Sequence, residues 1–259
     1  MKTSNTHSNS TSIENVPLLI LAGGKATRLK DLSVNTPKYL MPITDPKSLD
    51  KEKVQTFADF HLKWAYEQGF RRIFLSVGHL AEAIKEYCKD GSKWSLNISY
   101  LDDGSSPKGT GGAIALSLSH NFDYLAITYG DTMLTLNAGE LFDHLLTTQN
   151  RNQNIKGLMT IYPLNIEGHI ANASYDNGLA RYSKKEPNPD WKHIDYGFLF
   201  LQRDLVEGLP SSRPLDLAEP LADFCSKNKI LAHICKERFW EIGSLESLQE
   251  FQNRFSNKT

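Results

Sequence analysis

Two adjacent glycines and two cations follow the first strongly apolar run of the chain. The run at residues 17–22 leads into Gly23 and Gly24, and Arg28 and Lys38 come next. A glycine pair lets backbone N–H groups approach a phosphate closely, and the two cations add donors for its charge. The spacing excludes a Walker A loop and interrupts the GxGxxG pattern of dinucleotide-binding folds. A structural strand-to-helix turn with surface Arg and Lys is the alternative.

An acidic residue closes a later apolar run. Asp131 follows residues 124–129, where a carboxylate is suited to hold Mg²⁺ against a nucleotide phosphate. The alternative is an Asp that caps a turn, which is common at strand ends.

The elements that must position these residues alternate through the first half of the chain. Continuous apolar runs predict buried strands, and apolar residues at i, i+3, i+4 and i+7 predict helices. Such a βαβ series predicts a doubly wound, mostly parallel sheet with helices on both faces, which is a Rossmann-like or glycosyltransferase-A-like fold. The expected strands are 17–22, 72–77, 96–101 and 124–129, and the expected helices are 54–69, 80–89, 110–119 and 138–148.

The second half is richer in strands and is expected to face the substrate. A turn signal at residues 176–178 (Asp-Asn-Gly) predicts a hairpin. We expect residues 1–15, rich in Ser, Thr and Asn, to be a disordered tail, and residues 16–259 to form a single domain. The expected strands are 157–163, 171–175, 179–183, 194–201 and 230–234, with helices at 217–227 and 245–254.

Composition excludes several classes of protein. The chain has 259 residues, of which 40% are hydrophobic, and its 29 basic and 30 acidic residues give a net charge of −1. This balance argues against a dedicated nucleic-acid binder. We expect neither a membrane span nor a signal peptide, and a cytoplasmic protein. The three cysteines have no CxxC spacing, so a disulfide framework or structural zinc site is not expected.

Several motifs together resemble a known family. LAGGKATRL at residues 21–29 and TPKYLMPI at 36–43 resemble the N-terminal signature of the sugar-1-phosphate nucleotidyltransferases, although that family usually has Gly where this chain has Ala26. The resemblance resumes at 109–113, 130–132, 195–197 and 240–243. Within the family, the compact length and the GTGGAI and GDT segments are most similar to the heptose-1-phosphate guanylyltransferase branch.

The resemblance implies an enzyme that joins an NTP to a sugar 1-phosphate in the presence of Mg²⁺, giving an NDP-sugar and pyrophosphate. Arg28 would contact the leaving phosphates and Lys38 the α-phosphate. The implied nucleotide-binding residues are Leu21, Ala22, Gly23, Gly24, Thr27, Arg28, Lys38, Asp103, Gly109, Thr110 and Gly130. The implied sugar-phosphate residues are Gly112, Lys185, Asp195 and Gly197, and the implied metal ligands are Asp131 and Glu241.

Alternatives stay open for several of these assignments. Asp102 and Asp103 could accept from the N–H donors of guanine, which favours GTP, or could be solvated acids. The segment before Thr110 could be a plain helix N-terminus. Lys184 and Lys185 could form a solvated basic face. His79, His169 and His193 show no metal-ligand spacing and receive no role.

The favoured substrates are GTP and a heptose or hexose 1-phosphate. A related enzyme using UTP, dTTP or CTP is one alternative, and a nucleotide-sugar-binding regulatory module without chemistry is another. The interrupted glycine pattern argues against a Rossmann dehydrogenase. The expected partners are these small molecules, with no nucleic acid and no membrane, and a homo-oligomer stays open.

Overall fold

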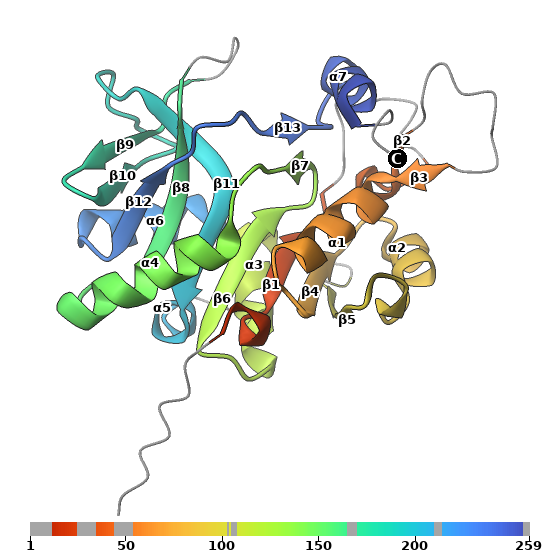
Figure 1. Ribbon diagram of the computed structural model, residues 1–259, viewed down its shortest axis with the longest axis horizontal. Helices are drawn as coiled ribbons and strands as arrows, with labels where there is room; N and C mark the ends of the chain where they lie inside the picture. The colour runs from red at the N-terminus through yellow and green to blue at the C-terminus, as the bar shows by residue number, and fades with distance from the viewer. Residues whose placement is uncertain are drawn as a thin grey trace, which may run out of the picture.

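A computed structural model describes residues 12–24, 35–43, 54–102, 104, 108–164, 170–209 and 214–255. Nine strands form one sheet in the order β5-β4-β1-β6-β11-β8-β12-β10-β9, which runs through both halves of the chain (Figure 1). Two small two-stranded sheets stand beside it. The expected fold class, an α/β protein with helices on both faces of a Rossmann-like sheet, is confirmed.

The first half supplies four parallel strands. β1 lies between β4 and β6, with Ile20 in register with Leu75 on one side and Thr128 on the other. The strands are β1 (Leu18–Leu21), β4 (Arg72–Val77), β5 (Asn97–Asp102) and β6 (Tyr124–Tyr129). The intervening helices are α1 (Phe57–Glu67), α2 (Ala81–Cys88), α3 (Gly109–Leu116) and α4 (Ala138–Arg151).

The second half joins this sheet in a different way. β11 is antiparallel to both β6 and β8, while β12 is parallel to β8. The sheet is therefore parallel in the first half and mixed in the second. The strands are β8 (Gly157–Pro163), β9 (Ala173–Asp176), β10 (Leu179–Tyr182), β11 (His193–Gln202) and β12 (Ile230–Ile234). The helices are α5 (Arg203–Glu207), α6 (Ala218–Ser226) and α7 (Leu245–Phe255).

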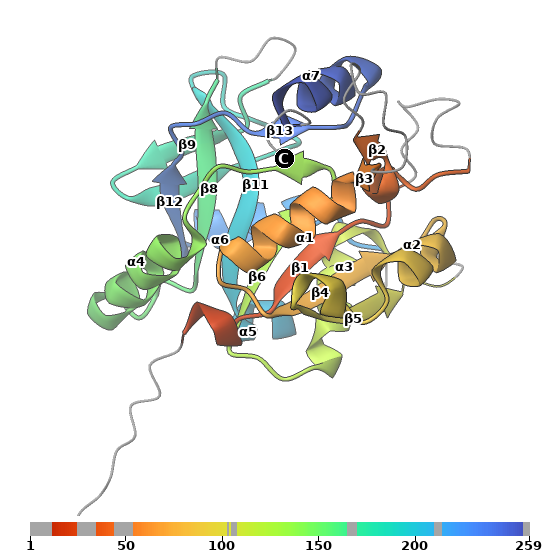
Figure 2. The same cartoon turned by 45° about the vertical axis from the view of Figure 1, so that its right-hand side comes forward.

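Alternation along the strands divides the core into two layers. In β1, Leu18 and Ile20 belong to the layer under α1 and α4, whereas Leu19 packs in the layer under α3, α5 and α6 (Figure 2). Both layers are apolar because side chains of a strand point alternately to the two faces of a sheet. A fully buried strand therefore needs apolar residues at every position, as the continuous runs predicted.

Several short elements were not expected from the sequence. Residues 54–56 are not helical, and α1 begins at Phe57 instead of residue 54. The Asp59 side chain accepts a 2.8 Å hydrogen bond from the Thr56 backbone N–H, which caps the helix at its N-terminus. The remaining short elements are β2 (Pro42–Ile43), β3 (Gln55–Thr56), β7 (Thr132–Met133), β13 (Trp240–Glu241), η1 (Ile13–Asn15), η3 (Lys38–Leu40) and η4 (Ser92–Trp94). The helix expected at residues 110–119 is observed as α3 followed by η5 (Ser117–Ser119).

The boundary of the expected N-terminal tail is wrong. Ile13–Asn15 form the 3-10 helix η1, and the Ser12 side chain accepts a hydrogen bond from the Glu14 backbone N–H. Glu14 lies 3.5 Å from the Arg71 guanidinium, which ties the segment to the residue before β4. Residues 12–15 are thus part of the folded domain, and residues 1–11 lie outside the described residues.

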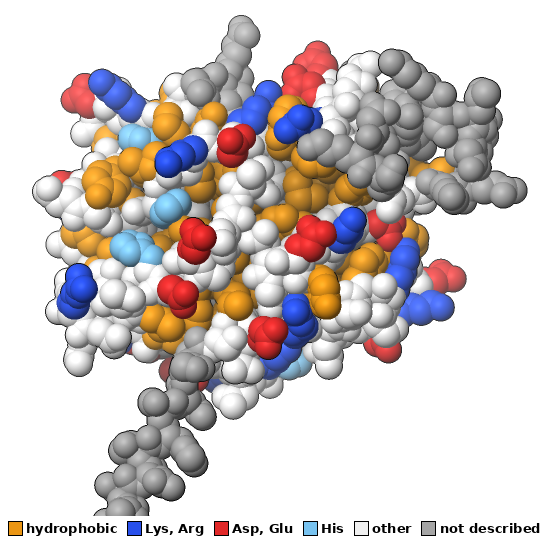
Figure 3. All heavy atoms as spheres, in the orientation of Figure 1, with side chains coloured by type: hydrophobic (Ala, Val, Ile, Leu, Met, Phe, Trp, Pro, Cys, Tyr) orange, Lys and Arg blue, Asp and Glu red, His pale blue; other side chains and the backbone are white. Residues whose placement is uncertain are grey.

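Acidic and basic side chains are interspersed on the face of the molecule shown in Figure 3, so this face carries no extended patch of one charge. Within the described ranges, no helix combines the length and the apolar character that a bilayer crossing requires. The three cysteines are buried, and burial raises the pKa of each thiol to about 12.

Candidate nucleotide-binding site

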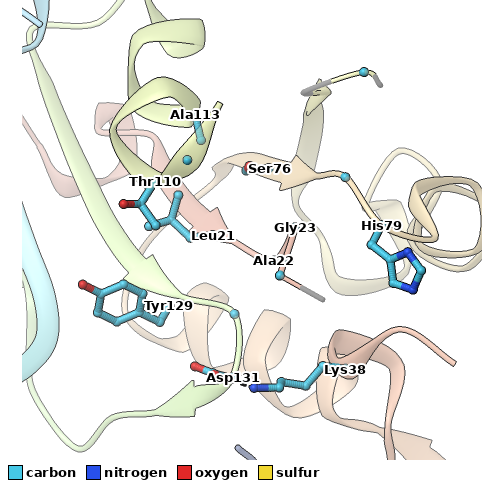
Figure 4. A pocket seen from close by; sticks show the side chains of 15 residues that line it. Leu21, Ala22, Gly23, Lys38, Ser76, His79, Thr110, Ala113, Tyr129 and Asp131 are labelled. Atoms are coloured by element: carbon cyan, nitrogen blue, oxygen red, sulfur yellow. Dashed lines mark hydrogen bonds and ion pairs between the residues drawn. The ribbon is translucent and has the colours of Figure 1, made fainter. Parts of the chain in front are cut away.

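A cavity of about 710 Å³ opens at the carboxyl ends of β1, β4 and β6 (Figure 4). The chain moves from β1 to β4 on one side and later to β6 on the other, so the cavity lies at the switch point where α/β sheets bind ligands. The lining residues are Leu21, Ala22, Gly23, Gly24, Lys38, Ser76, Gly78, His79, Gly104, Gly109, Thr110, Ala113, Tyr129, Gly130 and Asp131.

All of the predicted nucleotide-binding residues that the structure describes therefore lie around one cavity. Thr27, Arg28 and Asp103 lie outside the described residues, as do Ala26 and His169. The roles predicted for Thr27, Arg28 and Asp103 stay predictions, as does the expectation that His169 has no role.

Two glycines are required by close approaches in the cavity wall. A Cβ atom on Gly130 would lie 2.8 Å from the Ala22 Cα, where β1 and β6 end side by side. Gly109 has φ +75°, and a Cβ there would lie 2.5 Å from the Leu215 carbonyl oxygen. Only glycine fits at these two positions without displacing backbone, so the wall carries main-chain atoms there.

Lys38 and Asp131 meet at one end of the cavity. The Lys38 Nζ lies 2.9 Å from Asp131 Oδ2, and the side chains are 19% and 33% exposed (Figure 4). Pro37, at φ −61°, precedes the short helix that carries Lys38. The Thr132 hydroxyl donates to Asp131 Oδ1 at 3.0 Å. The predicted α-phosphate cation and the predicted metal ligand are thus adjacent, and in this structure they neutralise each other.

Glu241 lies on the neighbouring strand. β13 pairs with β7 so that Glu241 is opposite Thr132, and the Ile242 N–H donates to the Asp131 carbonyl oxygen at 3.0 Å. The backbone carrying Glu241 is therefore next to Asp131. Its carboxylate, however, lies 3.7 Å from the position that a Cβ on Gly243 would occupy, and Glu241 is not among the cavity-lining residues.

The described residues contain no group of three or more His, Cys, Asp or Glu side chains placed to hold a metal ion. Mg²⁺ usually takes only one or two carboxylates and completes its shell with water and substrate phosphates. A donor set of Asp131, with Glu241 on the adjacent strand, fits that chemistry. The helix expected at residues 245–254 is observed as α7 (Leu245–Phe255), and Ser244 Oγ accepts from the Ser247 N–H at 3.1 Å.

Asp195 and Gly197 support the cavity from behind. Neither lines it; Asp195 is held in β11, where burial raises the pKa of its carboxyl group. Its oxygens accept from the Gly197 N–H at 2.9 Å and from the Tyr129 hydroxyl at 3.4 Å. Gly197 has φ +93°, and a Cβ atom at this position would lie 3.1 Å from the Tyr129 ring. Both residues therefore position Tyr129, which does line the cavity.

The other predicted sugar-phosphate residues are not in the cavity wall. Gly112 is buried in α3, where a Cβ would lie 2.4 Å from the Lys108 side chain. Lys185 is 74% exposed, and its Nζ lies 2.8 Å from Glu219 Oε1 at the start of α6. Gly112 therefore lies next to the cavity wall, between Thr110 and Ala113 in α3, whereas Lys185 is not among the residues that line the cavity.

Sequence reasoning missed Tyr129, His79 and several small residues of the wall. In Figure 4, Tyr129 and His79 lie on opposite sides of the Ala22–Gly23 segment. His79 follows β4 and precedes Leu80, whose φ of 56° turns the chain into α2. Their positions in the sequence could have identified them, because both residues stand at the carboxyl end of a parallel strand.

Fold and site together define an α/β protein with a cavity at the switch point of its sheet, and comparisons with known proteins identify the family. The family model described as "Nucleotidyl transferase" matches residues 18–166, so the chain belongs to this family.

Two curated relatives and one solved structure illustrate the similarity. The chain is 26% identical over 219 residues to a UTP–glucose-1-phosphate uridylyltransferase from Synechocystis, covering 78% of the chain and 53% of that protein. It is 32% identical over 123 residues to a D-glycero-alpha-D-manno-heptose 1-phosphate guanylyltransferase from Campylobacter jejuni, covering 48% and 51%. The chain thus spans about half the length of these curated relatives.

The solved structure is HddC from Yersinia pseudotuberculosis complexed with GMP-PN. It has a TM-score of 0.70 and 20% identity, covering 93% of this chain and 99% of that one. At this identity the similarity concerns the fold.

Proposed function

We propose that this protein is a sugar-1-phosphate nucleotidyltransferase, which transfers a nucleotidyl group from an NTP to a sugar 1-phosphate and releases pyrophosphate. The observation that carries the proposal is the Lys38–Asp131 pair, 2.9 Å apart, in a cavity whose lining includes Gly23 and Gly24. A cation, a carboxylate and glycines that permit close backbone approach match the needs of a polyphosphate. The names of both curated relatives describe this type of reaction.

The chemistry requires little beyond positioning and charge neutralisation. The attacking phosphate oxygen of the sugar 1-phosphate is already anionic at pH 7, so no general base is needed. The barrier arises because two anions must meet in line at the α-phosphorus. Lys38 would neutralise the α-phosphate, and Arg28 would contact the departing β,γ-phosphates. Mg²⁺, held by Asp131 and Glu241, would supply charge neutralisation between the phosphates.

GTP is the proposed nucleotide, with a heptose or hexose 1-phosphate as acceptor. Support comes from the guanylyltransferase among the relatives and from the GMP-PN complex of a protein with a similar fold. The uridylyltransferase relative keeps UTP as the alternative. Asp102 does not line the cavity; it pairs with Lys85 at 2.7 Å and accepts from the Gly104 N–H at 2.8 Å. Asp103 lies outside the described residues and stays the predicted acceptor for guanine.

A pyrophosphate-release screen tests the proposal. Purified full-length protein with Mg²⁺ is incubated with each of four NTPs against glucose, mannose and heptose 1-phosphates, and phosphate is measured after pyrophosphatase treatment. We expect release that depends on both substrates, with the highest kcat/KM for GTP. A higher kcat/KM with UTP, dTTP or CTP would make the proposed nucleotide wrong, and no release from any pair would favour a binding module without chemistry.

A further inference from the structure

The segment that carries Lys38 is held against the start of α1. Tyr39, the next residue, is fully buried, and its ring centroid lies 6.3 Å from that of Phe57. The Tyr39 hydroxyl has no hydrogen-bond partner among the described residues, so packing holds the ring. The Phe57 N–H donates to the Met41 carbonyl oxygen at 2.9 Å, and β2 pairs with β3 directly before α1. The position of Lys38 therefore depends on where the N-terminus of α1 lies.

Asp59 fixes the N-terminus of α1 with a buried carboxylate. The residue is 7% exposed, and its carboxylate accepts from the Thr56 backbone N–H at 2.8 Å and from the Thr56 hydroxyl at 3.0 Å. The Tyr87 hydroxyl also donates to it, as does the Lys93 ammonium at 2.6 Å. These donors come from β3, α2 and η4, so one carboxylate ties α1 to three other elements. Hydrogen bonds to an ionised carboxylate are roughly twice as strong as those between neutral groups.

The Asp59 carboxyl group stays ionised despite its burial. Burial by itself would raise its pKa, but hydrogen bonds from Lys93, Tyr87 and Thr56 together hold the pKa below its usual value. Lys93 lies on the outside of the cluster and is 57% exposed. Its Nζ is 4.8 Å from the Tyr87 ring centroid and 4.7 Å from that of Trp94, and aromatic faces attract an ammonium. The Lys93 charge is therefore kept beside Asp59.

The same cluster connects the Lys38 segment to the cavity wall. α2 begins two residues after His79, which lines the cavity at the end of β4, and the Tyr87 hydroxyl fastens this helix to Asp59. Asp131 follows β6 of the large sheet, whereas Lys38 reaches it from a segment outside that sheet (Figure 4). The 2.9 Å distance between Lys38 and Asp131 thus depends on how α1 is held.

We infer that Asp59 is a positioning residue for Lys38, which holds the start of α1 so that the Lys38 ammonium stands in place for the α-phosphate. The inference rests on the proposed function, in which Lys38 neutralises the transferring group. Catalysis by a charged donor requires a fixed geometry, and a misplacement of about 1 Å can cost about a hundredfold in rate. Asp59 does not line the cavity, so it acts through Lys38 and not by contact with a substrate.

The first test measures kcat and KM in steady-state pyrophosphate release, with the NTP and sugar 1-phosphate that react fastest with wild-type protein. Asp59→Asn keeps the shape of the side chain and loses its charge, and Lys93→Met removes one donor. Both substitutions are also combined with Lys38→Ala. Lys63→Met is the matched control for Lys93→Met, because Lys63 is a 69% exposed lysine 4.0 Å from a carboxylate. Val206→Ala, at a buried position of the other core layer, controls for a general loss of stability.

We expect Asp59→Asn to lower kcat about tenfold, while KM for both substrates changes less than about twofold. Lys93→Met should lower kcat about twofold to threefold, because water can replace an exposed ammonium. In the Lys38→Ala background neither substitution should lower kcat further by more than about twofold, since residues that act through one contact are not additive. Lys63→Met and Val206→Ala should leave kcat close to that of wild type.

The second test does not depend on turnover. Lys38→Met, Asp131→Asn and their double variant are unfolded in urea, and the coupling of the pair is measured in the wild-type and Asp59→Asn backgrounds. We expect a coupling of about threefold to tenfold in the unfolding equilibrium constant in the wild-type background, and less than about twofold in the Asp59→Asn background. Where Asp59→Asn is too unstable to purify, Lys93→Met and Tyr87→Phe take its place in both tests.

Several outcomes overturn the inference. An unchanged kcat in Asp59→Asn, or the same fall in kcat with and without Lys38→Ala, shows that Asp59 does not act through Lys38. A Lys38–Asp131 coupling that is equal in the two backgrounds shows that the pair keeps its place without Asp59. An equally large fall in kcat in Val206→Ala shows that lost stability is the cause. If wild-type protein releases no pyrophosphate, the proposed function fails, and the coupling measured in urea alone decides the inference.

Discussion

Two regions of the molecule are built from different parts of the polypeptide: the cavity wall, called the nucleotide side after the proposed function, and the charged pairs beside it, called the acceptor side. On the nucleotide side, Gly23 and Gly130 stand at the ends of β1 and β6 and Gly109 begins α3, so the wall carries no side chain at these positions. On the acceptor side, Lys184 and Asp216 pair across a long stretch of chain, and neither lines the cavity. Positions held by the sheet depend on backbone packing, whereas charged pairs depend on their partners, so the two regions should respond differently to substitution.

The largest expected effect is on the nucleotide side. Lys38→Ala should lower kcat by about 10²–10³, because removing one preorganised donor from a transferring group costs about 2.7–4 kcal/mol. The substrate KM values should change much less. The measurement is steady-state pyrophosphate release, with Lys63→Ala as control, since Lys63 is 69% exposed and pairs only loosely with Glu67 at 4.0 Å. A kcat within threefold of wild type would remove Lys38 from the proposed mechanism.

Substitutions of Glu241 test whether β13 takes part in the proposed binding of Mg²⁺. Glu241→Gln keeps the volume and loses the charge, so it should lower activity about tenfold to a hundredfold and weaken the response to Mg²⁺ while the fold stays intact. Glu241→Asp should retain substantial activity. Activity is measured as a function of Mg²⁺ concentration, with thermal unfolding as the check on folding. An unchanged Mg²⁺ titration in the Gln variant would leave Asp131 and the substrate phosphates as the only metal ligands.

The close packing of α3 against Leu215 can be tested by substitution of Gly109. Gly109→Ala places a Cβ 2.5 Å from the Leu215 carbonyl oxygen at φ +75°, whereas Gly178→Ala has φ +87° and meets nothing within 4 Å. The second variant therefore measures the cost of the backbone conformation alone, roughly 1–2 kcal/mol. We expect Gly109→Ala to lower the free energy of urea unfolding by about 2 kcal/mol more than that. Equal losses would mean that α3 shifts freely against Leu215.

A smaller effect concerns the layer beneath Lys38. His61 is fully buried against the Tyr39 ring, with centroids 5.9 Å apart, and burial lowers its pKa to about 3, partly offset by the Asp131 charge. In the unfolded chain, His61 takes up a proton near pH 6.5, whereas in the folded chain it does so only near pH 3. The stability that depends on neutral His61 is therefore fully present above pH 6.5 and is lost as pH falls toward 3. Between pH 7 and pH 5 it amounts to about 2 kcal/mol.

The measurement is urea unfolding at pH 7 and pH 5 for wild-type protein and His61→Phe. The variant removes the titrating group and keeps an aromatic ring, so its loss of stability between the two pH values should be about 2 kcal/mol smaller. An identical pH dependence in the two proteins would show that His61 stays accessible to protons in the folded state.

The sequence signals that place residues of the nucleotide side together are local. Continuous apolar runs marked β1, β4 and β6, and ligands bind at the carboxyl ends of such strands, so Gly23, Lys38 and Asp131 were found together. The same reasoning could have found Tyr129. By contrast, β7 and β13 are two residues long and carry no periodicity, so their pairing was invisible until the structure joined them.

The acceptor side was predicted less well for a physical reason. Lys184 and Lys185 are neighbours of the same type, and only the three-dimensional positions of Asp216 and Glu219 distinguish them. Asp195 was expected to contact the sugar, but the alternating pattern of β11 does not reveal that its carboxylate turns inward beneath Tyr129. Such contacts join residues far apart in the chain, which a local pattern does not encode.

The contact between Gly109 and Leu215 also sets an order of events during synthesis. These residues are far apart in sequence, and β7 is completed only when β13 emerges at Trp240–Glu241. Chains are synthesised from the N-terminus at about 5–20 residues per second, so the residues that line the cavity are made several seconds before the segments that pack behind them. A ribosome-bound chain therefore contains Gly23, Gly24 and Lys38 early, but the supports at Leu215 and β13 are added only after residues 215–241 have been made.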